Sequence, residues 1–291
     1  MGEQVLVVGG GAAGLMAAGS AALRGARVVL LEKTDALGKK LQIAGKGRCN
    51  LTNAGEREEL IAGYAAGGRF LQSAFARFDN QDLIDLFARL GVPTKVERGR
   101  RVFPVSDDAR EVVRALTGWI EALGVEIRLS HSVGSLVADG QSSRRIVGCL
   151  VKDRFVPGDK VILCTGGCSY PGTGSTGDGY RMAQGLGHRI TPLRPALVPL
   201  RSSAPWVKEV QGFALRNVRA TLWAEDKELA SEFGEMLFTH FGVSGPIILT
   251  ISRSASDYWQ ERPGEPLTLT IDLKPALTPD KLDSRLQRDF G

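Results

Sequence analysis

The segment Val5–Glu32, VLVVGGGAAGLMAAGSAALRGARVVLLE, contains the pattern that decides the fold of this chain. It begins with an apolar run rich in β-branched residues, which is typical of a strand buried on both faces. A helix of small residues follows and stops at Gly25, and a second apolar strand covers Arg27–Leu31. The segment therefore predicts a strand–helix–strand unit.

Three glycines at the end of the first strand form the pattern G-x-G-x-x-G. Gly9 permits a tight turn, Gly11 lets a pyrophosphate approach the backbone, and Gly14 lets the helix pack closely on the sheet. Ala12 and Ala13 lie between them and are expected to line the same turn.

Glu32 ends the second strand, about 20 residues after the glycines, where a carboxylate can accept both hydroxyls of an adenosine ribose. A glycine-rich turn alone is weak support for a ligand site. The strands, helix, glycines and acid together predict adenine-dinucleotide binding, with a unit that binds nothing as the alternative. They do not separate FAD from NAD.

The composition is that of an ordinary globular chain, with 291 residues, 43% hydrophobic and 24% charged. That length suggests two domains. No apolar stretch approaches the roughly 18 residues that span a bilayer, and no secretory signal precedes the first strand. We therefore expect a cytoplasmic protein without a membrane segment.

The cysteines predict no metal site. Cys49, Cys149, Cys164 and Cys168 form no C-x-x-C pair, and no His/Cys cluster has zinc spacing. The net charge of +5 and the pI near 9.1 are compatible with a polyanionic partner, although many enzymes have similar values.

A basic, glycine-rich segment follows Glu32 and includes Lys33, Lys39-Lys40 and the run Gly45–Asn53, GKGRCNLTN. Backbone N–H groups and cations in such a segment can converge on a diphosphate. A solvated basic loop fits these residues equally well.

The residues Glu32-Lys33, Gly38–Lys40 and Gly45–Asn53 closely resemble those of the BaiN-like (YhiN-type) bacterial FAD-dependent oxidoreductases. The resemblance implies an α/β fold, a glutathione-reductase-like (Rossmann-type) FAD-binding domain with an inserted mostly-β domain. It implies FAD as the cofactor and NAD(P)H as a small-molecule electron donor. The residues that it places around the diphosphate and flavin are Lys33, Lys40, Gly45, Gly47, Arg48, Cys49 and Asn50.

Two later elements complete the predicted FAD domain. By the resemblance, the backbone after the strand 125–129 meets adenine, which makes Val133 the adenine contact. A strand from Lys160 ends in Thr165-Gly166-Gly167, which matches the "A-T-G" element where the chain passes close to the cofactor. The Gly/Ser/Thr-rich loop 168–179 again resembles the family.

The region between these parts predicts helices and one hairpin. Asp79 is expected to cap a helix that stops at Gly91, and the aromatic side chains Phe70, Phe75 and Phe78 are expected in the core. Three arginines, Arg98, Arg100 and Arg101, lie at the bend of the hairpin 92–104. They fit a solvated turn, the preferred interpretation, or a phosphate-contacting patch.

A proline-rich spacer at 187–195 predicts a boundary between an FAD-binding domain, 1–190, and a mostly-β domain, 191–291, that ends in the start of a helical subdomain. In the family, the chain returns to the FAD domain with a last strand and helix beside the flavin. No segment after Ala196 resembles that return, so we expect either a truncated sequence or an incomplete flavin site.

The resemblance implies NAD(P)H-driven reduction of a C=C bond, which needs a hydride from the flavin and a proton from a side chain. Cys49 and His240 are the candidate donors. A packing role is an equal alternative for Cys49, and a structural role is favoured for His240.

The substrates that the resemblance implies are uridine in large-subunit ribosomal RNA, reduced to dihydrouridine, and a steroid or bile-acid enone. The basic pI slightly favours RNA. The competing interpretations are a non-catalytic FAD- or nucleic-acid-binding module and an NAD-dependent dehydrogenase without flavin.

Overall fold

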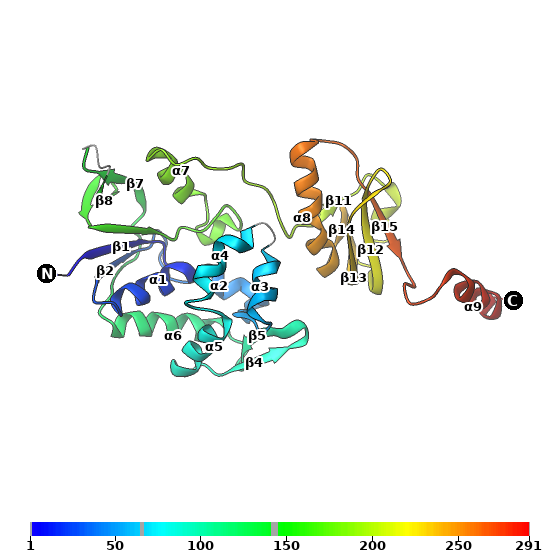
Figure 1. The fold of residues 1–291 in the computed structure, drawn as a ribbon, viewed down its shortest axis with the longest axis horizontal. Coiled ribbons are helices and arrows are strands. Elements are labelled where there is room, and N and C mark those ends of the chain that lie inside the picture. The colour runs from blue at the N-terminus through cyan, green and yellow to red at the C-terminus, as the bar shows by residue number, and fades with distance from the viewer. Residues whose placement is uncertain (1, 65–66, 141–144, 291) are drawn as a thin grey trace. The chain divides into compact units, whose positions relative to one another are not determined.

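The computed structural model describes residues 2–64, 67–140 and 145–290. The chain forms two compact units, residues 1–190 and 191–291, which are labelled by element in Figure 1. The polar run 139–143 predicts a turn between two strands, and part of it lies outside the described residues.

The first unit is built on a parallel sheet in the order β10–β1–β2–β6. Its strands are β1 Gln4–Val8, β2 Arg27–Leu31, β6 Glu126–Arg128 and β10 Lys160–Leu163. Successive side chains point to opposite faces, and both faces are buried, which explains the continuous apolar runs. The predicted Rossmann-type α/β class is confirmed.

Helices cover one face of this sheet. α1 (Ala12–Ala22) and α6 (Ala109–Ala122) pack there against Val5, Val7 and Leu30. The two helices meet at Gly19, where a Cβ atom would lie 2.2 Å from the Trp119 ring. A small residue is therefore required at this crossing.

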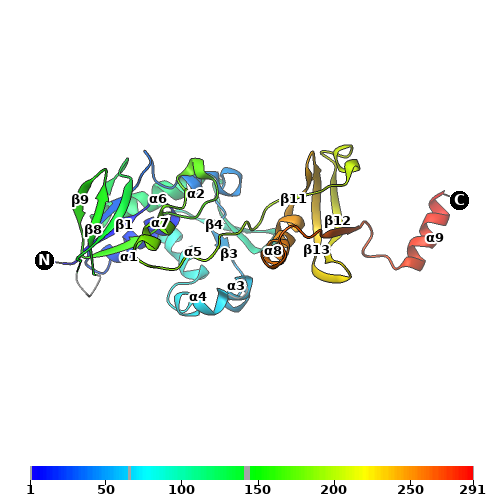
Figure 2. The same ribbon diagram turned by 90° about the horizontal axis from the view of Figure 1, so that it is seen from above.

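A three-stranded antiparallel sheet and α7 (Asp178–Gly185) cover the other face, as Figures 1 and 2 show. The strands are β7 Val133–Ala138, β8 Ile146–Val151 and β9 Arg154–Pro157. The sequence pattern predicts strands at 132–138 and 145–151, which correspond to β7 and β8, but does not predict β9, which completes the layer beside them.

The residues between β2 and β6 form a helical layer and a small sheet in the order β3–β5–β4. The elements are α2 Lys39–Ile43, η1 Ala44–Gly47, β3 Thr52–Asn53, α3 Arg57–Gly63, α4 Gly68–Phe75, α5 Asn80–Arg89, β4 Thr94–Glu97, η3 Arg98–Arg100 and β5 Arg101–Pro104. The predicted cap is confirmed, because Asp79 accepts hydrogen bonds from the N–H groups of Gln81 and Asp82.

The predicted core position of Phe70 is wrong. Its side chain is 88% exposed, and Phe78 is 42% exposed. The physical reason is that α4 buries only Gly68 and packs at the surface, where Tyr64 contacts Phe75 edge to face.

The second unit is an antiparallel sheet in the order β11–β14–β13–β12–β15 with one long helix against it. Its elements are β11 Leu200–Arg201, η5 Pro205–Lys208, β12 Ala214–Ala224, β13 Lys227–Thr239, β14 Gly242–Ser244, α8 Pro246–Glu261, β15 Thr268–Asp272 and α9 Pro279–Phe290. The run Ser244-Gly245-Pro246 predicts a helix start with proline in the first turn. This is confirmed, because α8 begins at Pro246, where a missing N–H costs nothing.

Candidate cofactor-binding site

A cavity of about 650 Å³ opens at the carboxyl ends of β1, β2 and β10. This edge is where open α/β sheets bind their ligands. The lining residues that the structure describes all belong to the first unit and come from segments far apart in the sequence. Those from the sequence prediction are Gly9, Gly11, Ala12, Ala13, Glu32, Lys33, Lys40, Val133, Thr165 and Gly166.

The three motif glycines differ in how closely other protein atoms surround them. A Cβ on Gly9 would lie 2.5 Å from the carbonyl oxygen of Cys164, and one on Gly14 would lie 1.7 Å from the Gly9 oxygen. A Cβ on Gly11 would meet no protein atom within 4 Å. Gly9 and Gly14 are therefore required by the packing of the protein itself, whereas Gly11 leaves free space at the cavity wall.

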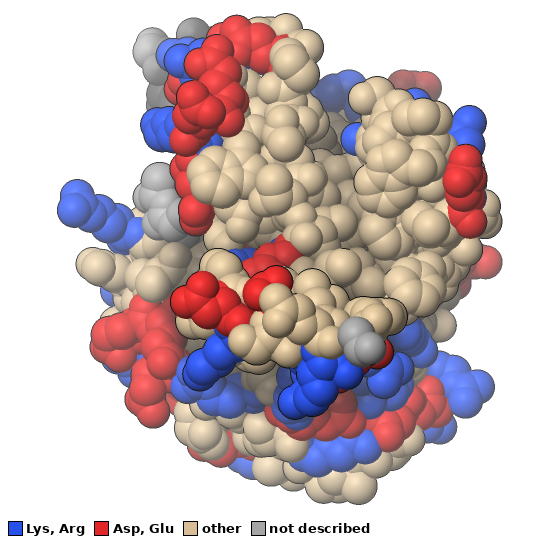
Figure 3. Space-filling model, turned by 90° about the vertical axis from the view of Figure 1, so that its right-hand side faces the viewer, with Lys and Arg blue, Asp and Glu red and all other residues tan. Residues whose placement is uncertain are grey.

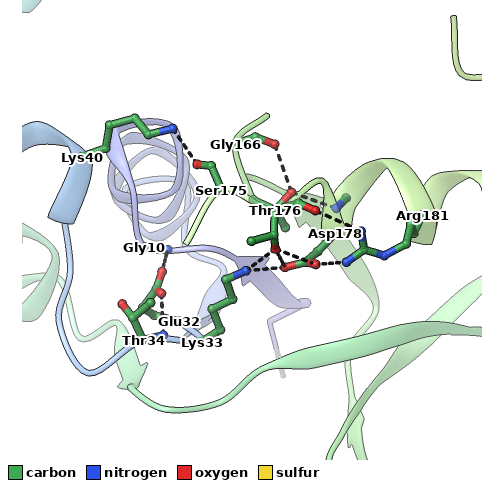
Figure 4. Close-up of polar contacts among 12 residues, drawn as sticks. Gly10, Glu32, Lys33, Thr34, Lys40, Gly166, Ser175, Thr176, Asp178 and Arg181 are labelled. Atoms are coloured by element: carbon green, nitrogen blue, oxygen red, sulfur yellow. Dashed lines mark hydrogen bonds and ion pairs between the residues drawn. The ribbon is translucent and has the colours of Figure 1, made fainter. Parts of the chain in front are cut away.

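Glu32 connects two backbone segments of the cavity wall by hydrogen bonds. Its Oε2 accepts a hydrogen bond from the Gly10 N–H at 2.6 Å, and its Oε1 accepts one from the Thr34 N–H at 2.7 Å (Figure 4). Each carboxylate oxygen has a further lone pair, so both can still accept a hydroxyl. The side chain is 9% exposed, which fits a group that meets a ligand from one side.

Two lysines hold the glycine-rich loop 168–177 against the cavity, as Figure 4 shows. Lys33 Nζ donates to Thr176 Oγ1 at 2.7 Å and forms an ion pair with Asp178 at 2.6 Å. Lys40 Nζ donates to the Ser169 carbonyl and to Ser175 Oγ, both at 2.7 Å. The lysines thus place cations at the cavity and tie its two sides together.

The electrostatics of Asp178 reflect these contacts. Burial by itself raises the pKa of this carboxyl, but the hydrogen bonds from Lys33 and Thr176 and the charges of Lys33 and Arg181 outweigh burial. The pKa of Asp178 therefore lies below its ordinary value, and the carboxylate is ionised at neutral pH.

Several predicted cofactor residues lie outside the cavity lining, namely Gly14, Gly45, Gly47, Arg48, Cys49, Asn50 and Gly167. Arg48 forms ion pairs with Glu97 at 2.9 Å and Asp107 at 3.4 Å, and its guanidinium lies 4.1 Å from the centre of the Phe103 ring. The Glu97 hydrogen bond, opposed by desolvation, raises the Arg48 pKa. In this structure Arg48 fixes the loop rather than facing the cavity.

The two candidate proton donors have different surroundings. Cys49 is 1% exposed among core residues, and burial raises the pKa of its thiol to about 11. This burial favours the packing alternative. His240 lies in the second unit, between β13 and β14, where its exposed ring contacts Phe241 edge to face.

The structure adds lining residues to which the sequence analysis gave no cofactor role, among them Thr34, His131, Ser175 and Asp178. His131 follows the predicted strand 125–129, where a satisfied surface histidine is the favoured expectation. It lines the cavity beside Val133, and its Nδ1 lies 2.7 Å from the Leu129 oxygen. Its position two residues after that predicted strand is the signal that could have found it. Ser175 lies in the loop before α7 and Asp178 begins that helix, and the residues that they contact cannot be inferred from their local sequence.

No cluster of three or more His, Cys, Asp or Glu side chains suited to a metal occurs in the described part of the chain. Within the same residues, no helix is long and apolar enough to cross a membrane.

The cavity and the residues present fit an adenine dinucleotide. Free space at Gly11 lies at the N-terminus of α1, where backbone N–H groups favour an anion. Glu32 has unused acceptor capacity for a ribose, and Val133 supplies an apolar wall. The adenine, its ribose and the diphosphate thus each have a matching group at this cavity.

The sequence matches a known protein family and several characterised proteins. Residues 3–263 match the family model described as HI0933-like protein Rossmann domain. The chain is 33% identical over 91% of its length to the ribosomal RNA dihydrouridine synthase of Escherichia coli (strain K12), of which it covers 63%. It is also 33% identical over 94% of its length to the 3-dehydro-bile acid delta(4,6)-reductase of Clostridium scindens, of which it covers 65%.

The chain therefore spans less than two thirds of the length of these curated relatives. Among solved structures, the open conformation of a flavocytochrome c3 fumarate reductase superposes with a TM-score of 0.50 at 22% identity. The match covers 74% of this chain and 47% of that one. This likeness concerns the fold.

Proposed function

The chain belongs to the HI0933-like protein family, and we propose that it is an FAD-dependent oxidoreductase that uses NAD(P)H to reduce a C=C bond. The observation that supports the proposal is the cavity beside Gly11 and Glu32, which fits an adenine dinucleotide. The family match and the FAD-binding fold class make FAD the resident dinucleotide.

The reaction is inferred from what the names of two relatives share. A dihydrouridine synthase saturates the C=C bond of a uracil ring, and a delta(4,6)-reductase saturates C=C bonds of a steroid. Bound FAD, once reduced by NAD(P)H, would supply a hydride to one carbon of such a bond, and a side chain would supply the proton for the other.

The residues of this chain would bind and orient the cofactor. Glu32 accepts the ribose hydroxyls, and Val133 packs against the adenine. The backbone at Gly11 and the ammonium of Lys40 face the diphosphate, because both present positive charge at the cavity. His240 is our proposed proton donor, because its side chain is exposed whereas Cys49 is buried.

Ribosomal RNA is the substrate that we favour. The net charge of +5 suits a polyanion, and Figure 3 shows Lys and Arg side chains mixed with Asp and Glu side chains on the surface. A cytoplasmic location follows from an RNA substrate. A steroid or bile-acid enone is the second candidate, favoured by the equal identity to the bile-acid reductase.

The proposal is tested first with the purified protein. A flavin spectrum that NADH or NADPH bleaches without oxygen is expected. A flavin spectrum that neither donor bleaches would instead indicate a non-catalytic binding module, and a colourless protein that oxidises NADH would indicate a dehydrogenase without flavin. Deleting the gene should then remove dihydrouridine from ribosomal RNA, and unchanged RNA would refute the RNA substrate.

A further inference from the structure

We propose that Lys46, Arg98 and Arg101 form a basic edge that contacts the phosphates of an RNA substrate next to the cofactor cavity. The inference rests on the proposed function, because it assumes that the substrate is an RNA. It assigns a role to the arginines of the β4–β5 bend, which the cofactor-binding site does not use.

The bend is fixed to the segment that leaves the cavity. Asn53 Nδ2 donates to the Gly99 carbonyl at 2.8 Å, and the Ala54 N–H donates to the Arg100 carbonyl at 2.7 Å. The Leu51 N–H donates to the Val102 carbonyl at 2.8 Å. These bonds hold the bend against the residues that follow α2.

α2 itself reaches the cavity. Lys40 and Leu41 on α2, and Ala44 directly after it, line the cavity wall. Lys46 follows only two residues after Ala44. Lys46 therefore continues the segment that forms the cavity wall. The Phe103 ring links this segment to the bend, because a Cβ on Gly45 would lie 3.1 Å from the ring and the Arg101 guanidinium lies 5.6 Å from its centre.

The acids of this region are already paired with other cations. The ion pairs are Arg48–Glu97 at 2.9 Å, Lys95–Asp107 at 2.5 Å and Arg100–Glu59 at 2.7 Å. These contacts satisfy the local carboxylates without using the three proposed residues. The sequence from 36 to 55 contains no acidic residue, so it supplies no further carboxylate that could pair with Lys46.

Lys46, Arg98 and Arg101 are exposed, and within the described residues none of them forms an ion pair. Arg101 donates from Nε to the Arg98 carbonyl at 3.1 Å, and its guanidinium lies 5.6 Å from the Phe103 ring centre. These contacts orient Arg101 without neutralising it. Three unneutralised cations on one short edge suit several phosphates in succession.

A phosphate contact of this kind positions RNA without reading its sequence. A steroid has no row of anions that would use three cations, so the edge distinguishes the two candidate substrate classes. The cavity would still select the base to be reduced. The basic edge would raise the affinity for the RNA and orient it toward the cavity.

The experiment uses the FAD-loaded protein and a fluorescein-labelled transcript of large-subunit ribosomal RNA. The triple variant Lys46→Gln/Arg98→Gln/Arg101→Gln is compared with a control of equal charge change, Arg154→Gln/Lys160→Gln/Lys227→Gln. The control residues are exposed and form no ion pair among the described residues. Fluorescence anisotropy gives the affinity at several salt concentrations, and absorbance gives flavin content and reduction by NADH.

We expect the triple variant to lose about tenfold or more in affinity near 0.15 M salt. The slope of log affinity against log salt should fall in magnitude by about 2, at roughly 0.7 for each single-stranded contact. The control should stay within about threefold of the natural protein. Flavin content and reduction should be equal in all three proteins.

Equal affinity of the triple variant and the control would overturn the proposal. A protein whose flavin is reduced by NADH but which binds no RNA would overturn the basic edge and leave the oxidoreductase proposal intact. RNA binding through the edge without flavin reduction would refute the oxidoreductase instead.

Discussion

The carboxylate of Glu32, at the end of β2, accepts a hydrogen bond from the backbone N–H of Gly10, just after β1, at 2.6 Å. This bond joins the group expected to hold the ribose to the turn expected to hold the diphosphate. The spacing between the two subsites is therefore set before a ligand arrives, and less conformational freedom is lost on binding.

Replacing Glu32 with Gln or Ala should weaken FAD retention by about 10- to 100-fold. A hydrogen bond to a charged group contributes about 1.5–3 kcal/mol, and both variants lose the carboxylate that binds two backbone N–H groups and that we propose to bind the ribose. Dilution of the loaded protein and recovery of FAD fluorescence measure the release. Glu126→Gln is the control, because its carboxylate pairs with Arg128 outside the cavity. Retention equal to that control would show that the ribose contact is misassigned.

Alanine at two of the motif glycines should have separable effects. Gly14→Ala places a methyl group 1.7 Å from the Gly9 oxygen and should destabilise the fold by about 1–3 kcal/mol or more. Gly11→Ala meets no protein atom within 4 Å and should leave the stability of the free protein unchanged while reducing FAD affinity. Urea unfolding with and without FAD measures both. A Gly11→Ala protein with full FAD affinity would argue against a diphosphate at this wall.

Lys40→Met should accelerate FAD release by about tenfold or more, since a charge-assisted contact is lost. Faster hydrogen exchange of the loop 168–177 should accompany it, because Lys40 holds Ser169 and Ser175. Lys152→Met, at the exposed turn between β8 and β9, is the matched control. Unchanged exchange in the Lys40 variant would mean that the loop is held by other contacts.

The cysteines should react in an order set by burial. Cys168 is exposed and should be alkylated first in the native protein, whereas Cys49 should react only after unfolding. The native pKa of Cys49, about 11, lies above its ordinary value of 9.0. The stability from burying the neutral thiol is thus complete below pH 9 and is lost as the pH rises toward 11.

The comparison of the natural protein with Cys49→Ala isolates this contribution. The natural protein should lose more unfolding free energy between pH 9 and pH 11 than the variant does. Equal losses would indicate that the thiol is accessible in the folded state. Urea titrations at the two pH values give both free energies.

The local parts of the fold could be predicted from the sequence, because their causes are local. The apolar run of β1, the glycine turn and the Asp79 cap each depend on residues within a few positions. The sequence does not predict β9, because this short, exposed strand depends on its pairing with β8 rather than on a pattern of its own. The prediction for Phe70 is wrong because periodicity does not reveal whether a helix has anything to pack against.

The candidate site also contains parts that the local sequence predicts and parts that it does not. The glycines and Glu32 come from one continuous segment, so their spacing was informative. The ion pair between Lys33 and Asp178 joins residues 145 positions apart, and neither sequence neighbourhood contains a signal for the other. The roles assigned to these residues stay predictions until FAD binding is measured.

The parallel pairing of β1 with β10 has a consequence for synthesis of the protein. The Gln4 N–H donates to Asp159 across 155 residues of chain, and the same pairing brings Thr165 and Gly166 to the cavity. A growing chain therefore exposes its complete glycine turn long before the opposite wall has been translated. Such distant pairing is slow to form. FAD should consequently bind only after the first unit has been synthesised and folded. The nascent glycine turn by itself should bind no cofactor on the ribosome.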